Sequence, residues 1–198
     1  MNARCRFMMQ MTAFVLLFTA GCSSPSPSIA ALKDVSCTLA DGSSKPLSSM
    51  LGTTATLFVT LDPDCPFCQL YAHDLQEFAS RYGAQGVRVV GVYAGPYMEA
   101  VKAERFAADG NFTFPQVMDH DCMLTLALNA RVTPEVFLMD AKGERIYHGA
   151  FDDRAVRQGR KKIAAQQYWL TDAMDAYLRN RAPSPEVIAV GCIVECKK

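Results

Sequence analysis

The sequence lacks an excess of charge of either sign. Its 20 lysine and arginine residues are matched by 20 aspartate and glutamate residues, so the formal net charge at pH 7 is 0. Proteins that bind nucleic acids or acidic polymers usually carry clustered or excess basic residues. We therefore expect no nucleic-acid partner.

Histidine is also scarce. The 3 histidines, His73, His120 and His148, are scattered along the chain and stand in no informative context. Zinc sites usually combine closely spaced cysteines and histidines. We expect no metal site. The chain shows no internal repeat, and its length suits a single domain with one core.

The N-terminus contains no acidic residue before Asp34. Arg4 and Arg6 precede an apolar run, Met11–Ala20, which is shorter than the roughly 20 apolar residues that a membrane-spanning helix needs. This layout is typical of a secretory signal. We expect residues 1–21 to be a lipoprotein signal peptide that does not belong to the fold.

The segment Thr19-Ala20-Gly21-Cys22 resembles a bacterial lipobox. The resemblance implies that Cys22 is lipidated and begins the mature protein, which would anchor the chain in the bacterial cell envelope, on its periplasmic or extracellular face. Residues 22–34 begin with serines and prolines and are expected to form a flexible tether. Cleavage by ordinary signal peptidase, giving a soluble secreted protein, is the alternative.

Strand and helix patterns alternate over residues 35–182, which we expect to form the folded domain. Strands are predicted where apolar and β-branched residues run together, at Thr54–Leu61, Val87–Tyr93 and Pro134–Asp140. Apolar spacing of three and four residues predicts helices over Pro66–Tyr82 and Ile163–Arg181, the latter with Ile163, Tyr168 and Leu170 among its core contacts. This order predicts an α/β fold, a central mixed sheet with helices on both faces. Residues 183–198 form a cysteine-containing tail.

The most informative motif is Cys65-Pro66-Phe67-Cys68, at the junction between a predicted strand and a predicted helix. A helix N-terminus presents unpaired N–H groups and a partial positive charge, which stabilise a thiolate. We expect Cys65 to be the nucleophile and Cys68 the resolving thiol of an exchange through a mixed disulfide. There are two alternatives for this motif. One is a structural disulfide, and the other is half of a zinc site that Cys192 and Cys196 complete.

The order of strand, Cys-x-x-Cys, helix and then Val132-Thr133-Pro134 entering a strand resembles the thioredoxin-like superfamily. Several segments resemble its exported redoxin branch, the TlpA-like and peroxiredoxin-like proteins: Asp41-Gly42, Asp62–Cys68, Thr133–Leu138, Tyr147–Asp153 and Ala189–Cys192. The resemblance implies a thioredoxin-like fold in which Pro134 follows a cis peptide bond and faces the cysteine pair. It also implies that Thr133 binds substrate, and we expect Pro66 and Phe67 to do so too.

The function implied by this resemblance is that of an exported thiol–disulfide oxidoreductase. Its redox group would be the Cys65–Cys68 disulfide, with no other cofactor. Its partners would be exported proteins with thiols or disulfides and a membrane electron donor or acceptor. A peroxiredoxin-type thiol peroxidase is one alternative, although Asp62 and Phe58 stand where typical peroxiredoxins have threonine and proline. A copper-binding assembly chaperone is the other.

Three acidic residues are candidate modulators of the pair. Asp62 and Asp64 would raise the pKa of Cys65 by like-charge repulsion, or they are turn residues only. Glu135, directly after Pro134, is either a base for Cys68 or a surface residue.

Four further cysteines need an assignment: Cys37, Cys122, Cys192 and Cys196. One interpretation is a structural disulfide that joins the tail to the body of the domain through Cys37 or Cys122, which are otherwise expected to form an element-end disulfide or to be two buried thiols. The other is a second redox pair that relays electrons to Cys65 and Cys68.

Overall fold

The computed structural model describes residues 28–196 of the chain. The expected signal peptide, the lipidation site Cys22 and the first part of the tether lie outside the described residues, so these expectations stay predictions. Within residues 28–196, none of the helices has the length and apolar character needed to cross a membrane.

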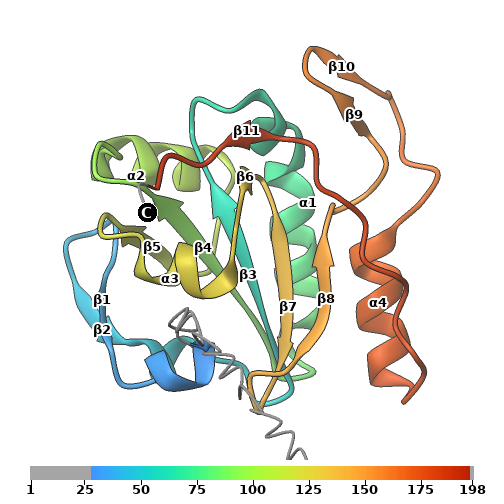
Figure 1. Ribbon diagram of the computed structural model, residues 1–198, viewed down its shortest axis with the longest axis horizontal. Helices are drawn as coiled ribbons and strands as arrows, with labels where there is room; N and C mark the ends of the chain where they lie inside the picture. The colour runs from blue at the N-terminus through green and yellow to red at the C-terminus, as the bar shows by residue number, and fades with distance from the viewer. Residues whose placement is uncertain (1–27, 197–198) are drawn as a thin grey trace, which may run out of the picture.

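A five-stranded mixed sheet forms the centre of the molecule, with strand order β5-β4-β3-β7-β8 (Figure 1). The neighbours β3, β4 and β5 run parallel, whereas β7 is antiparallel to both β3 and β8. The strands are β3 (Ala55–Leu61), β4 (Val87–Ala94), β5 (Gln116–Asp119), β7 (Val136–Asp140) and β8 (Arg145–Gly149).

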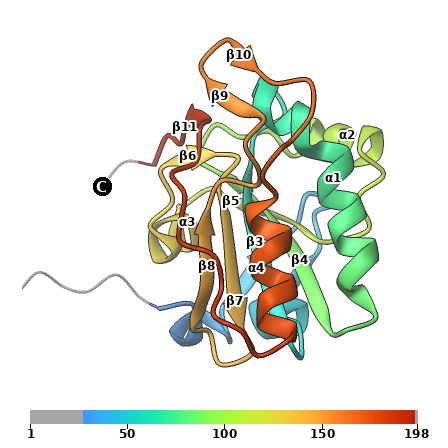
Figure 2. The same ribbon diagram turned by 90° about the vertical axis from the view of Figure 1, so that its right-hand side faces the viewer.

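Side chains of the central strand β3 are buried on both faces of the sheet, which explains its unbroken apolar run. Leu57 and Val59 point into one apolar cluster with α1, α2 and α4, and Phe58 points into the other with α3. The sheet therefore lies between two helical layers, as Figure 2 shows for α1 and α3. The helices are α1 (Pro66–Gly83), α2 (Ala100–Asp109), α3 (Met123–Leu128) and α4 (Trp169–Leu178). The predicted α/β fold with helices on both faces is confirmed.

Small elements complete the second layer. The hairpin of β1 (Ser36–Thr38) and β2 (Ser44–Pro46) and the 3-10 helices η1 (Ile29–Leu32) and η2 (Leu47–Met50) lie on the side of α3. Ile29 and Leu32 are buried. Residues 29–32, which we expected to belong to a flexible tether, are therefore part of the folded structure.

The last helix is shorter than predicted. It begins at Trp169 rather than Ile163 because the Asp153 carboxylate accepts hydrogen bonds from the backbone N–H groups of Gln166 and Gln167, so this backbone is not helical. Ile163 is fully exposed, so the prediction of a core contact there was wrong, and Tyr168 is half-exposed. The residues before the helix instead contain a hairpin, β9 (Ala155–Arg157) and β10 (Arg160–Lys161).

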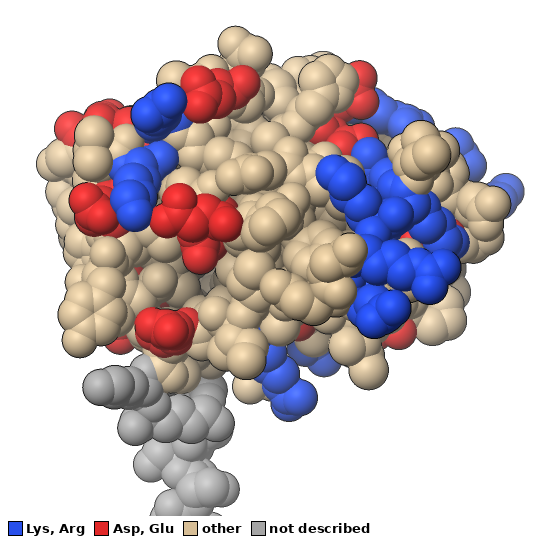
Figure 3. All heavy atoms as spheres, turned by 90° about the horizontal axis from the view of Figure 1, so that it is seen from above, with Lys and Arg blue, Asp and Glu red and all other residues tan. Residues whose placement is uncertain are grey.

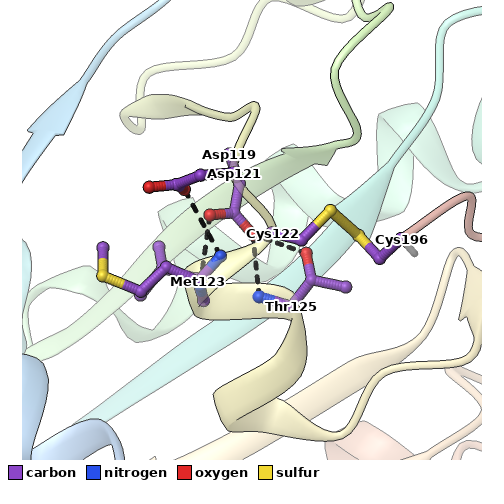
Figure 4. Close-up of a disulfide and its surroundings, with 7 residues drawn as sticks. Asp119, Asp121, Cys122, Met123, Thr125 and Cys196 are labelled. Atoms are coloured by element: carbon purple, nitrogen blue, oxygen red, sulfur yellow. Dashed lines mark hydrogen bonds between the residues drawn. A yellow bond between two sulfur atoms is a disulfide. The ribbon is translucent and has the colours of Figure 1, made fainter. Parts of the chain in front are cut away.

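The C-terminal tail returns to the end of the sheet that carries the N-terminus of α1 (Figure 1). There β11 (Cys192–Ile193) pairs antiparallel with β6 (Val132–Thr133). A disulfide between Cys196 and Cys122, which precedes α3, then joins the tail to the body (Figure 4). The sequence did not predict the pairing of β11 with β6.

The start of α4 can be tested with two alanine substitutions. We expect Leu170→Ala to lower the free energy of unfolding by about 2–5 kcal/mol, because Leu170 is fully buried and the change leaves a cavity. Ile163→Ala should change it by no more than about 0.5 kcal/mol, because that side chain is exposed. Urea unfolding measures both, and equal losses for the two variants would contradict the observed start of the helix.

Candidate functional site

The turn after β3 places Cys65 at the N-terminus of α1. The Cys65 N–H donates to the Asp62 carbonyl over 3.1 Å, and the Asp64 N–H donates to the Asp62 carboxylate over 2.8 Å. Cys65 is the N-cap residue, and Pro66 occupies the first helical position, where its missing N–H costs no hydrogen bond. Cys68 follows in the first turn, where its sulfur accepts a hydrogen bond from the Asp62 N–H.

Both sulfurs contact Thr133. Cys65 Sγ lies 3.1 Å from the Thr133 carbonyl oxygen, to which the thiol form donates. Cys68 Sγ lies 3.1 Å from Thr133 Oγ1. The peptide bond between Thr133 and Pro134 is cis. The structure thus brings together Cys65, Cys68, Thr133 and Pro134, which the sequence analysis placed in one site.

A third sulfur belongs to the same cluster. The Cys192 thiol in the tail donates a hydrogen bond to Cys65 Sγ over 2.8 Å. Cys122 and Cys196 are joined to each other, and Cys37 is a buried free thiol in the second apolar cluster, on the side of α3. Of the four cysteines left unassigned by sequence, Cys192 is the one that reaches the pair.

The three thiols differ in acidity. Hydrogen bonds from Cys68, from Cys192 and from the backbone N–H groups of Phe67 and Cys68 outweigh burial and lower the pKa of Cys65 to about 5. Burial, together with the bond to Cys65 and its charge, raises the pKa of Cys68. The same causes raise the pKa of Cys192 to about 12. At neutral pH the site therefore holds one thiolate, on Cys65, beside two protonated thiols.

Asp62 and Asp64 act mainly as turn residues. Asp62 accepts the Asp64 N–H, and the Asp64 carboxylate forms an ion pair with Lys102 at 3.1 Å. The largest effects on the pKa of Cys65 come from sulfurs, burial and backbone amides rather than from these carboxylates. Asp62 contributes instead to the raised pKa of Cys192.

Glu135 is neither exposed nor directed at Cys68. Its neighbour Val136 points into the cluster with α1, so Glu135 points to the opposite face of the sheet. There His148 lies 2.7 Å from its carboxylate, and the backbone N–H groups of Arg131 and Val132 donate to it. Burial alone would raise the pKa of Glu135, but these hydrogen bonds outweigh burial and lower it. The carboxylate thus holds the loop that leads into β6.

The residues between the two cysteines lie in different environments. Pro66 is exposed and available to a partner, whereas Phe67 is buried and packs in the cluster with α1. The Phe67 side chain is therefore not available for the expected substrate contact. Within residues 28–196 there is no group of three or more histidine, cysteine, aspartate or glutamate side chains arranged to hold a metal ion.

Both cysteines of the pair are covered. Cys65 is 1% exposed and Cys68 is 0% exposed. Next to them lies a groove of about 240 Å³ between the tail and the start of α2, lined by residues that include Asp62, Thr133 and Ile193. A larger cavity, of about 1010 Å³ between α1 and α4, is lined by none of the three sulfurs.

The charges around the site are unevenly distributed. In Figure 3, which looks onto this end of the molecule, acidic side chains lie mainly on one side and basic side chains on the other. The acidic residues at the groove are Asp62, Asp64, Glu99 and Glu195. The exposed basic residues on and beside the β9–β10 hairpin are Arg157, Arg160, Lys161 and Lys162.

Sequence reasoning missed the covering tail, although it noted Ala189-Val190-Gly191-Cys192 as a family-like segment. The signal was Gly191. A Cβ atom at this position would lie 2.3 Å from the Thr133 carbonyl oxygen, so only glycine lets the tail approach Thr133 this closely. A network of Tyr71, Asp152 and Arg154, which links α1 to the chain after β8, was also missed.

The low pKa of Cys65 predicts the pH dependence of the thiolate. In the reduced protein, we expect the ultraviolet absorbance of one thiolate to be lost as the pH falls through about 5. Cys65→Ser should remove this transition and Cys37→Ser should leave it in place. A transition near the pKa of about 8.5 of an ordinary cysteine would contradict the acidity derived from the contacts.

Because Gly191 packs closely against Thr133, we expect a methyl group at this position to displace the tail from the site. Gly191→Ala should increase the rate at which iodoacetamide alkylates Cys65, because the added Cβ conflicts with the Thr133 backbone. Gly83→Ala is the matched control, since a Cβ at Gly83 meets no atom within 4 Å. Equal alkylation rates in the two variants would show that the tail does not limit access.

Comparison with known proteins agrees with this geometry. The model of the Redoxin family matches residues 20–162. No curated protein sequence matches the chain. A solved structure of a hypothetical protein from Sinorhizobium meliloti 1021 has a TM-score of 0.73 and 27% identity, over 84% of this chain and 92% of that one.

Two further structures show the fold at lower identity. A secreted disulfide oxidoreductase of Mycobacterium tuberculosis has a TM-score of 0.50 and 20% identity, over 57% of this chain and 80% of that one. Peroxiredoxin Q of Xanthomonas campestris has a TM-score of 0.55 and 19% identity, over 79% and 96%. By name, these two proteins are a disulfide oxidoreductase and a peroxiredoxin. The family model spans more than half of the sequence, and the chain therefore belongs to the Redoxin family, within the thioredoxin-like superfamily.

Proposed function

We propose that this protein is an exported thiol–disulfide oxidoreductase that exchanges disulfides with partner proteins through Cys65 and Cys68. The observation that carries the proposal is the pairing of a thiolate with a protonated thiol at one helix N-terminus. Cys65 has a pKa of about 5, whereas the pKa of the adjacent Cys68 is raised. These are the acidities that a nucleophile and a resolving thiol require.

The first step uses the thiolate of Cys65. Its sulfur attacks one sulfur of a partner disulfide, a mixed disulfide forms, and the other partner sulfur leaves as a thiolate. Cys68 then loses its proton and attacks Cys65 Sγ, which closes the Cys65–Cys68 disulfide and releases the partner as a dithiol. The first step removes the negative charge from Cys65. That charge is one cause of the raised pKa of Cys68. Formation of the mixed disulfide therefore makes the second step easier.

Export and anchoring rest on the N-terminal sequence and on one feature of the fold. The disulfide between Cys122 and Cys196 suits an oxidising compartment. We propose that a lipid on Cys22 holds the protein at the cell envelope, and that the tether keeps the domain close to the membrane. There it would meet exported substrates and a membrane electron donor or acceptor.

Peroxidase activity is the rival function within the same fold. The residue three positions before Cys65 is Asp62, whose carboxylate accepts the Asp64 N–H, so the threonine hydroxyl that peroxiredoxins typically place there is missing. The contacts of Cys65 Sγ in residues 28–196 are with Thr133 and with thiols and amides of the site. The missing threonine hydroxyl therefore favours exchange with a disulfide over reaction with peroxide.

The exchange activity can be measured with oxidised glutathione. We expect the reduced protein to consume it and to release two reduced glutathione molecules per chain, because the cysteine pair supplies two electrons. Cys65→Ser should abolish the reaction, and Cys37→Ser should react like the unchanged protein because Cys37 lies in the other apolar cluster. Mass spectrometry with alkylation of free thiols gives the products.

Two outcomes would overturn the proposal. One is consumption of oxidised glutathione by Cys65→Ser at the rate of the unchanged protein. The other is stoichiometric reduction of hydrogen peroxide that is much faster than the reaction with glutathione and is lost in Cys65→Ser, which would make the protein a peroxidase.

A further inference from the structure

The C-terminal tail is fixed at both ends of the stretch that crosses the site. We call residues 187–196 the C-terminal strap. At its start the Val187 carbonyl accepts a hydrogen bond of 2.8 Å from the Ala150 N–H, and at its end Cys196 is bonded to Cys122. The part between these two points therefore stays over the cysteine pair while the disulfide is intact.

The strap follows β6 as an extended strand. Cys192 lies opposite Thr133 in an antiparallel ladder, and the Val194 N–H donates to the Arg131 carbonyl over 3.1 Å. The strap thus covers the backbone edge directly before Pro134, beside the nucleophile. An extended partner segment would need the same edge, because main-chain pairing of this kind is how strands are added to a sheet.

The strap also places a sulfur against the nucleophile. Cys192 Sγ is 2.8 Å from Cys65 Sγ, close enough for one sulfur to attack the other. Cys65 and Cys68 are buried, whereas Cys192 is partly exposed. A partner thiol that approaches this face therefore reaches Cys192 before it reaches the pair.

We propose that Cys192 is a third redox cysteine, which takes the disulfide from Cys65–Cys68 and transfers it to the partner. The inference rests on the proposed exchange function, run here in the reverse direction so that the partner is oxidised, and adds a step to it. Cys192 loses its proton and its sulfur attacks Cys65 Sγ in the Cys65–Cys68 disulfide. The Cys65–Cys192 bond forms as the Cys65–Cys68 bond breaks, and Cys68 leaves as a thiolate that is then protonated. No electron enters or leaves the chain in this step.

The transfer to the partner then follows. A partner thiolate attacks Cys192 Sγ, and Cys65 leaves as a thiolate. Cys65 is the best leaving group of the three sulfurs because its pKa is the lowest. A second partner thiol attacks the mixed disulfide, Cys192 leaves and is protonated, and the partner ends with a disulfide. The partner has lost two electrons and the site has gained them.

The internal disulfide can be trapped by removal of Cys68. Reduced Cys68→Ser is treated with oxidised glutathione, which first forms a mixed disulfide at Cys65. Cys192 should then displace the glutathione, so that the product is a Cys65–Cys192 disulfide and two reduced glutathione molecules. A protease that cleaves after glutamate, at Glu186 and Glu195, separates Cys192 from Cys196 and allows the linked peptides to be identified by mass spectrometry.

Two double variants serve as controls. Cys68→Ser/Cys192→Ser should keep glutathione on Cys65, because no second sulfur is within reach. Cys68→Ser/Cys37→Ser, which also loses a second free cysteine but one distant from the site, should behave like Cys68→Ser. Thermal unfolding of all three variants shows whether each is folded.

The outcomes separate this inference from the proposed function. Glutathione that remains on Cys65 in folded Cys68→Ser, with Cys192 still a free thiol, would overturn the role of Cys192 and leave exchange at Cys65 intact. If Cys65 takes up no glutathione in any variant, the exchange function itself fails. As a second measurement, the oxidised protein with Cys192→Ser should be reduced by glutathione several-fold more slowly than the unchanged oxidised protein, and an equal rate would contradict the transfer.

Discussion

The site depends on the backbone and hydroxyl of one residue, Thr133. Its carbonyl lies against Cys65, its hydroxyl against Cys68, and its strand pairs with the segment that carries Cys192. The buried carboxylate of Glu135 holds the loop before it through two backbone N–H groups. The end of β6 therefore sets the positions of all three sulfurs relative to one another, and the acidity of Cys65 follows from that arrangement.

Burial and reactivity oppose each other at this site. Burial of Cys65 alone would raise its pKa, and the thiolate is stable because hydrogen bonds from two thiols and from backbone amides of α1 replace the lost water. The strap supplies one of these hydrogen bonds and also blocks direct access to the nucleophile. Access to the site is therefore selective. A partner must either react with the partly exposed sulfur of the strap or displace the strap itself.

The sequence was sufficient for the fold and for the centre of the site. The apolar run at Thr54–Leu61 and the Cys65–Cys68 spacing predicted a strand, a helix and the reactive pair between them, because these signals are local. The start of α4 was missed because the carboxylate of Asp153 binds the backbone before the helix, 13 and 14 positions further along the chain, and the intervening sequence carries no signal for this contact. The contact of Cys192 with Cys65 was also missed, because it depends on how β6 pairs. The orientation of Glu135 was missed because it depends on which face of the sheet the residue occupies.

The proposed exchange requires Cys65 and Cys68 to form a reversible redox pair, whose reduced form the thiolate should stabilise. The reduction potential of the pair tests this requirement and is measured by equilibration with glutathione buffers of varied composition and quantification of the oxidised fraction. We expect one reversible two-electron transition that is absent from Cys65→Ser. Its potential should be less negative than the roughly −270 mV of thioredoxin, because a stabilised thiolate makes the disulfide a stronger oxidant. A pair that cannot be reduced reversibly, or a potential at or below that of thioredoxin, would contradict it.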